Sequence, residues 1–139
     1  MTTMQRDHEQ TLRAFMQEWG KDFESVVAAF RRYLAPNAVW AQDPIPATHG
    51  IEEAVGLLRD TRERIGLCSF GADVRHVAVN GDVAFAERVD HLKRADGSLI
   101  FSLPVTGVFE FDRDGRIAVW REYFDSAPIM KAIAAASET

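Results

Sequence analysis

Residues 69–125 read SFGADVRHVAVNGDVAFAERVDHLKRADGSLIFSLPVTGVFEFDRDGRIAVWREYFD, and this stretch is the most informative about the fold. Asn-Gly or Asp-Gly pairs, beginning at Asn80, Asp96 and Asp114, separate segments rich in β-branched and aromatic residues. Such pairs supply the positive φ angles of tight hairpin turns. The segment therefore predicts four consecutive antiparallel strands, over residues 69–79, 82–94, 99–111 and 116–125.

These strands are longer than the usual length of about 5–6 residues, so we expect the sheet to curl. Pro104 and Gly107 are places where a strand can bend. The sequence before residue 69 is typical of helices, because apolar residues recur at helical spacing. The expected elements are helices from His8 to Trp19 and from Asp22 to Leu34, a strand over 38–42, an extended loop over 43–46, a helix over 51–67, and a last helix from Pro128.

This order predicts an α+β fold in one domain, residues 1–139. The N-terminal helices are expected on one face of a cone-shaped, curled mixed sheet, where they enclose a deep pocket for a small hydrophobic molecule. Arg88 and Asp90 share one face of their strand, because side chains alternate. If Trp120 and Phe124 face the pocket, Glu122 faces it too and comes within reach of that pair. The alternative is a solvated salt bridge between strands on the polar face.

Composition excludes several classes of partner. The 139 residues are 47% hydrophobic and 27% charged, and 16 Lys and Arg against 21 Asp and Glu give a net charge of −5. We therefore expect no nucleic acid and no membrane as partner. Without a signal-peptide pattern, the chain is expected to be cytoplasmic. The single Cys68 and the scattered histidines predict no metal site, and His8 is expected to be solvated.

Three motifs resemble a known family. They are Glu87-Arg88-Val89-Asp90, the stretch LPVTGVF at residues 103–109, and WREYFD at residues 120–125. Together they resemble the limonene-1,2-epoxide hydrolases, which belong to the nuclear transport factor 2-like or ketosteroid-isomerase-like superfamily. The resemblance implies a hydrolase without a cofactor that opens an epoxide of a small hydrophobic, terpenoid-like or cyclic molecule to a diol.

In this resemblance the family's catalytic triad falls on Asp90, Arg88 and Glu122. Glu122 would take a proton from the attacking water, Asp90 would donate one to the epoxide oxygen, and Arg88 would hold the two acids in unlike protonation states. The residues expected to contact substrate or water are Trp40, Gln42, Asp43, Leu103, Val105, Trp120 and Phe124.

The chain departs from the family pattern at three positions. Glu122 stands where the family has an Asp, so the base is one methylene longer. Trp40 and Gln42 stand where the family has the Tyr and Asn that orient the water. A glutamine still offers both a donor and an acceptor, whereas an indole offers only its N–H.

Two other functions are compatible with the sequence. Asp43-Pro44 resembles the Asp-Pro that carries the general base of ketosteroid isomerases, so Asp43 could serve a ketosteroid-isomerase-like or polyketide-cyclase-like proton transfer. In that superfamily an oxyanion-hole acid would fall near Gly107, which has no side chain. The second possibility is a protein that binds a small hydrophobic molecule without changing it, and such a protein has no need of a complete triad.

The outer face of the predicted sheet is unusually apolar. By strand parity it carries Phe85, Val89, Val119 and Tyr123. Monomeric proteins rarely expose a contiguous patch of this kind. We therefore expect a homodimer formed through this face.

Overall fold

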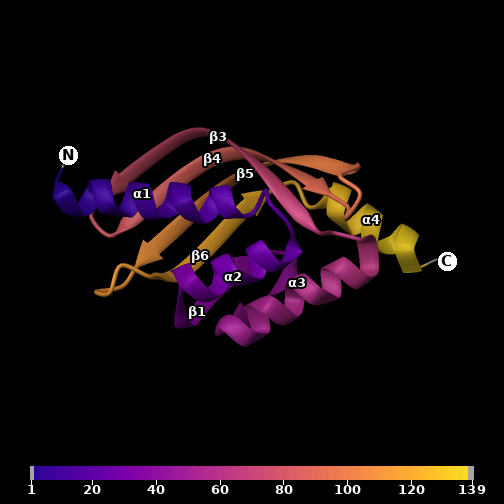
Figure 1. The fold of residues 1–139 in the computed structure, drawn as a ribbon, viewed down its shortest axis with the longest axis horizontal. Helices are drawn as coiled ribbons and strands as arrows, with labels where there is room; N and C mark the ends of the chain where they lie inside the picture. Colours follow the sequence, from indigo (N-terminus) through magenta and orange to yellow (C-terminus); the bar gives the residue numbers. More distant parts are fainter. Residues whose placement is uncertain (1, 138–139) are drawn as a thin grey trace.

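The structure is a computed structural model, and it describes residues 2–137. Within that range it has four helices and six strands (Figure 1). In chain order they are α1 (Thr3–Glu18), α2 (Phe23–Tyr33), β1 (Leu34–Gln42), β2 (Ile45–His49), α3 (Ile51–Ile65), β3 (Ser69–Asn80), β4 (Val83–Lys93), β5 (Leu99–Phe111), β6 (Ile117–Phe124) and α4 (Ala127–Ser137).

The strands form one sheet in the order β2-β1-β6-β5-β4-β3. Strands β3 to β6 pair as the predicted antiparallel meander. Their three tight turns contain Gly81, Gly97 and Gly115, all at positive φ. Strand β1 pairs parallel to β6, which makes the sheet mixed. The predicted α+β fold with a curled mixed sheet is therefore confirmed.

Helices α1, α2 and α3 share one hydrophobic core with the inner face of the sheet. Figure 1 shows α1 lying along the sheet, with α2 and α3 beside it and α4 at the far end. At the centre of this core Phe15 contacts the rings of Trp19, Phe30 and Trp120. The helices therefore cover the face of β6 that carries Trp120.

The stretch between α2 and α3 differs from the prediction. Strand β1 begins at Leu34 instead of residue 38, and the expected loop leads into a further strand, β2. Strand β2 contains Pro46 and pairs only with β1 at the edge of the sheet. Proline has no N–H to donate, and an edge strand tolerates this because one of its sides forms no hydrogen bonds to a neighbouring strand.

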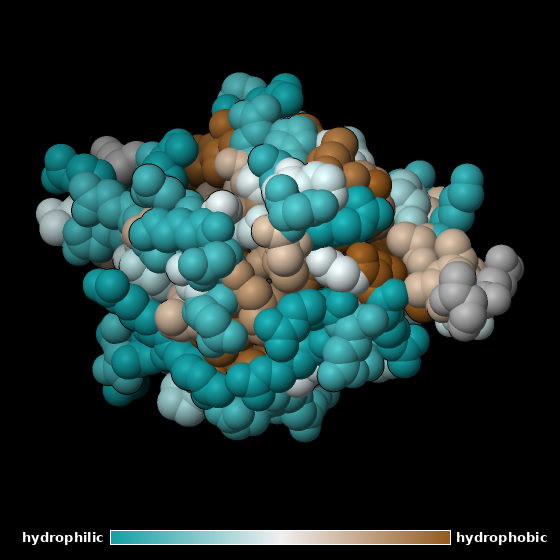
Figure 2. Space-filling view, turned by 45° about the vertical axis from the view of Figure 1, so that its right-hand side comes forward, coloured by the Kyte–Doolittle hydropathy of each residue, from teal (hydrophilic) through white to brown (hydrophobic). Residues whose placement is uncertain are grey.

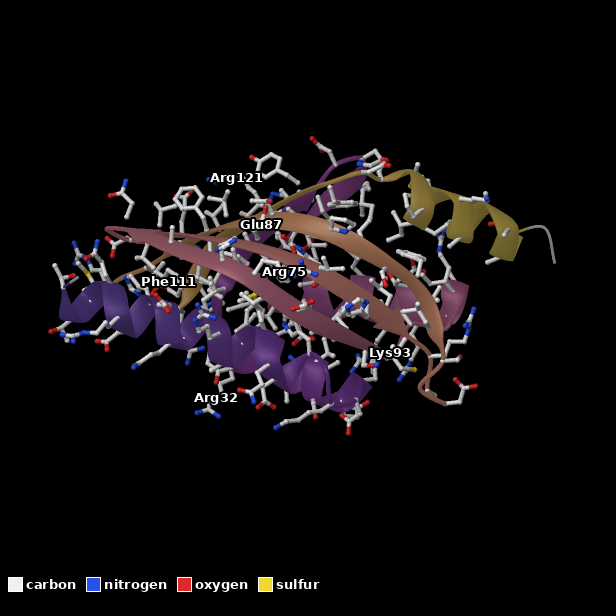
Figure 3. The ribbon with its side chains drawn as sticks, turned by 90° about the horizontal axis from the view of Figure 1, so that it is seen from above. Arg32, Arg75, Glu87, Lys93, Phe111 and Arg121 are labelled. Carbon is white, nitrogen blue, oxygen red and sulfur yellow. The ribbon has the colours of Figure 1, made fainter. Side chains whose placement is uncertain are left out.

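The other face of the meander carries both apolar and charged side chains. Phe85 is 39% exposed and Tyr123 is 58% exposed. Arg121 forms an ion pair with Glu110 across neighbouring strands of this face. In Figure 3, Glu87 and Arg121 lie on the side of the sheet away from α1.

Candidate active site

A cavity lies between the inner face of the sheet and the helices. Its volume is about 60 Å³, well below the roughly 300–1,000 Å³ of pockets that enclose drug-sized ligands. Aromatic and aliphatic side chains form most of the wall, and four polar residues interrupt it. The lining residues are Trp19, Phe30, Trp40, Gln42, Phe70, Arg88, Asp90, Leu92, Leu103, Val105, Trp120, Glu122, Phe124 and Ile129.

Strand β4 brings Arg88 and Asp90 to the inner face. The alternation of the strand places Ala84 and Ala86 on the same face, and both alanines are fully buried. Small residues at these positions leave space beside the sheet for a long side chain. The Arg88 side chain is only 1% exposed, although a guanidinium is one of the groups that proteins bury least often.

Arg88 binds two carboxylates at once. Its Nε lies 2.9 Å from Asp90 Oδ1, and its Nη2 lies 3.1 Å from Asp90 Oδ2. Its Nη1 lies 3.2 Å from Glu122 Oε2, and Nη2 also donates to Glu122 Oε1. Each carboxylate thus accepts two hydrogen bonds from the planar guanidinium, which is the strong, bidentate form of this pair.

Asp90, Arg88 and Glu122 bring two carboxyl groups and one guanidinium together in a site that is almost fully buried. Burial raises the pKa of Glu122, Arg88 opposes this by its charge and hydrogen bonds, and the charge of Asp90 adds to the rise. Burial also disfavours charge on Arg88, but the charges of Glu122 and Asp90 outweigh it and raise the pKa of Arg88. Two ionised acids would leave the cluster with a net negative charge. Retaining one proton makes it neutral, and that proton belongs to the coupled pair of acids.

Three tryptophans form one wall of the cavity. The rings of Trp40 and Trp120 stack with centroids 4.7 Å apart, and Trp19 stacks on Trp120 at 5.4 Å. The Arg88 guanidinium carbon lies 5.0 Å from the centre of the Trp19 ring, a distance typical of cation–π contacts. The buried indole N–H groups of Trp19 and Trp40 have no hydrogen-bond partner among residues 2–137.

The structure places most of the predicted contact residues around this cavity. Trp40, Gln42, Leu103, Val105, Trp120 and Phe124 all line it. Asp43 does not: its side chain is exposed, in a neighbouring hollow that Glu122 and Phe124 also line. Strand β1 ends at Gln42, so Asp43 starts the turn to β2 and leaves the inner face.

Several lining residues were not predicted from the sequence. Trp19 caps the C-terminal end of α1, Phe30 comes from α2, Phe70 from β3, and Ile129 from α4. The apolar stripes of the helices indicate burial, but they do not distinguish residues beside a cavity from residues within a solid core. Ile129 depends on how α4 packs against the end of the sheet, which no local pattern shows.

Among residues 2–137, no three His, Cys, Asp or Glu side chains gather where they could hold a metal ion. None of the helices in this part of the chain is both long and apolar enough to cross a membrane. The surface in Figure 2 is largely hydrophilic, with scattered hydrophobic patches.

Comparison with known proteins gives a family. The sequence profile of the limonene-1,2-epoxide hydrolase catalytic domain matches residues 6–135. The chain is 33% identical over 113 residues to epoxide hydrolase EphG of Mycobacterium tuberculosis (strain ATCC 25618 / H37Rv), a match that spans 81% of this chain and 69% of that protein.

Two solved structures have a similar fold. An M. tuberculosis LEH-like epoxide hydrolase matches with a TM-score of 0.71 and 23% identity, covering 96% of this chain and 94% of that one. A SnoaL-like protein from Jannaschia sp. CCS1 matches with a TM-score of 0.76 and 21% identity, covering 97% of this chain and 96% of that one. With the profile over residues 6–135 and the identity to EphG, this places the chain in the limonene-1,2-epoxide hydrolase family.

Proposed function

We propose that the protein hydrolyses an epoxide of a small hydrophobic molecule to a diol, without a cofactor. The observation that carries the proposal is Arg88, buried at the pocket wall with Asp90 on one side and Glu122 on the other. Burying three ionisable groups is costly, and a binding protein for an apolar molecule gains nothing from it. Membership of the family and the name of its relative EphG support the same reaction class.

In the proposed reaction Glu122 is the general base and Asp90 the general acid. Glu122 takes a proton from a water molecule while the water oxygen forms a bond to a ring carbon. The bond between that carbon and the epoxide oxygen breaks, and the oxygen receives the proton of Asp90. Glu122 ends protonated and Asp90 ionised, so the net charge of the triad does not change. Return of the proton to Asp90 then restores the starting state.

The surroundings of the triad suit these roles. When the proton shared by the two acids is on Asp90, the raised pKa of Glu122 makes its carboxylate a stronger base than a solvated one. Arg88 contacts both acids, so it stabilises whichever of them is ionised at each stage. Gln42 lines the same cavity and offers an amide to the water. The unpartnered N–H of Trp40 is a second donor in this wall.

The wall favours an apolar substrate. Apart from the triad and Gln42, the lining side chains are aromatic or aliphatic. A ring-shaped or branched hydrocarbon that carries the epoxide packs against such walls, while the polar epoxide oxygen turns toward the triad. We therefore expect terpenoid-like or cyclic epoxides of small size as substrates. Because the cavity measures only about 60 Å³, side chains of its wall have to move to admit them.

The test is diol release from a panel of small cyclic and terpene epoxides. Glu122→Gln keeps the size and one acceptor but removes the base, so kcat/KM should fall by roughly 10²–10⁴-fold. Asp90→Asn should cause a similar loss. Asp43→Asn is the matched control, because Asp43 is exposed outside the cavity and its variant should stay near wild type.

The same panel separates the rival functions. If Asp43→Asn abolishes turnover and Glu122→Gln preserves it, the triad assignment is wrong. If wild type binds the compounds but forms no diol, the pocket is a binding site only. A single turnover in ¹⁸O-labelled water tests the direct attack, because labelled oxygen must then appear in the diol. Unlabelled diol from that first turnover would indicate that a carboxylate, not water, attacked the ring.

A further inference from the structure

Strand β5 lies between β4, which carries Arg88, and β6, which carries Glu122. Its residue Gly107 pairs with Ala86 of β4 on one side and with Glu122 of β6 on the other. Arg88 is two residues along β4 from Ala86 and points to the same face. The ion pair between Arg88 and Glu122 therefore spans β5 directly over Gly107.

A side chain at this position would collide with the ion pair. A Cβ atom added to Gly107 would lie 2.7 Å from Glu122 Oε2 and 2.9 Å from Arg88 Nη1. It would also lie 2.7 Å from Cε1 of Phe109. These distances are below those of ordinary van der Waals contacts, so at least one of the three groups has to move.

Gly107 differs in this respect from another glycine of the same sheet. Gly71 lies in β3, and a Cβ atom there would be 3.7 Å from the nearest atom, in His91. Neither glycine has a positive φ, so both accept an alanine as far as the backbone is concerned. What sets Gly107 apart is the volume that the carboxylate and the guanidinium occupy above it.

We propose that Gly107 is a positioning residue: by having no side chain it provides the volume in which the carboxylate of Glu122 meets Arg88. This inference rests on the proposed function, since it concerns how the general base is held. It also accounts for the length of Glu122. A glutamate reaches one methylene further than an aspartate, and its carboxylate fits over β5 because residue 107 has no side chain.

The experiment is a double-mutant cycle of Gly107→Ala and Glu122→Asp, with Gly71→Ala as the matched control. Gly107→Ala should lower kcat by roughly 10²-fold, because the base and Arg88 are displaced. Glu122→Asp draws the carboxylate back from the added methyl group. In that background Gly107→Ala loses the contact with the carboxylate but keeps those with Phe109 and Arg88, so it should cost roughly tenfold instead of 10²-fold. Gly71→Ala should stay within about twofold of wild type.

The pH profile separates positioning from general damage to the fold. Displacing the carboxylate from Arg88 changes the balance that sets its protonation, so the acidic limb of the kcat profile should move in Gly107→Ala and not in Gly71→Ala. An equal loss of kcat in the two Glu122 backgrounds, or an unmoved pH profile, would overturn the inference. So would a Gly107→Ala variant as active as wild type.

Thermal unfolding of the four proteins of the cycle, which are wild type, the two single variants and the double variant, makes the test independent of activity. The loss of melting temperature caused by Gly107→Ala should shrink in the Glu122→Asp background. If Gly107→Ala does not fold but the double variant does, the inference stands; if neither folds, it fails. Should wild type turn over no epoxide, the proposed function fails while this coupling still reports on Gly107. Should wild type be active without any coupling, only the role of Gly107 is lost.

Discussion

Arg88 is held in place by both of the carboxylates that it bridges, and all three side chains are buried. Removing one partner from such a cluster leaves the others without compensation. Arg88→Leu would leave the two acids facing one another in an apolar pocket. We expect the free energy of unfolding at neutral pH to fall by about 3–5 kcal/mol, measured by chemical denaturation.

Arg75→Leu provides the comparison on the neighbouring strand. Arg75 pairs with Asp73 at 3.0 Å, but both side chains are about half exposed, at 54% and 50%. Such pairs contribute about 0–1 kcal/mol. If Arg75→Leu and Arg88→Leu lower the free energy of unfolding equally, the buried cluster does not stabilise the fold more than an exposed ion pair.

The pH dependence of stability follows from the raised pKa of Glu122, which burial causes. A carboxyl group whose pKa is higher in the folded than in the unfolded state binds its proton more tightly when folded. Its contribution to stability is therefore complete below the unfolded pKa of about 4.3 and is lost as the pH rises through the folded value. The stability of wild type relative to Glu122→Gln should fall over this window.

The measurement is chemical denaturation of both proteins at a series of pH values from about 4 upward. A stability difference that grows in favour of wild type as the pH rises would mean that the ion pair with Arg88 outweighs burial. The direction of the raised pKa would then be wrong.

Strand parity placed Arg88 and Asp90 on one face, and it brought Glu122 within reach only if Trp120 and Phe124 face the pocket, which they do in the structure. Parity alone leaves open which face is inside, and the buried Ala84 and Ala86 settle it in the structure. For His8 the prediction from the sequence was wrong. It was expected to be solvated, but it is buried, where it stacks on Phe111 and contacts Asp82 at 3.1 Å. These partners are distant in sequence, so the helix pattern gives no sign of them.

Among the elements, the four-stranded meander was predictable because each hairpin has a local turn signal. The parallel pairing of β1 with β6 has no such signal, since the two strands are separated by most of the chain. Strand β2 was missed for a related reason. Pro44 just before it and Pro46 within it favour extended backbone, and only pairing with β1 turns an extended segment into a strand.

Helix α3 contains a glycine that its surroundings do not require. Gly56 is exposed in the interior of the helix, and a Cβ atom there would meet nothing within 4 Å. Gly56→Ala should raise the free energy of unfolding by about 0.5–1 kcal/mol, because alanine has less backbone freedom to lose. Gly66→Ala, at the C-cap with φ of 77°, should lower it instead. Thermal denaturation compares the two, and a stabilising Gly66→Ala would contradict this account of the helix.

At the scale of the whole molecule, the outer face of the sheet leads to our proposal of a homodimer. Phe85 and Tyr123 are exposed there, with Val89 and Val119 half buried beside them. Covering these side chains in a pair of chains would remove apolar area from water. Light scattering at micromolar concentration should give about twice the chain mass of 15.6 kDa.

A charged substitution tests the face itself. Tyr123→Lys should shift the protein toward monomer, whereas Met4→Lys should not, although Met4 is 50% exposed on α1. A wild-type monomer, or a dimer that tolerates Tyr123→Lys and Phe85→Lys, would show that the outer face is not the interface.

The stack of indoles has an optical consequence. The chain has three tryptophans, and all of them line the cavity within one stack. Ultraviolet emission excited at the tryptophan band therefore originates at the pocket wall, without a background from indoles elsewhere. A molecule that enters the cavity changes the environment of these chromophores together, so its arrival can be followed in the unmodified protein and timed separately from the appearance of product.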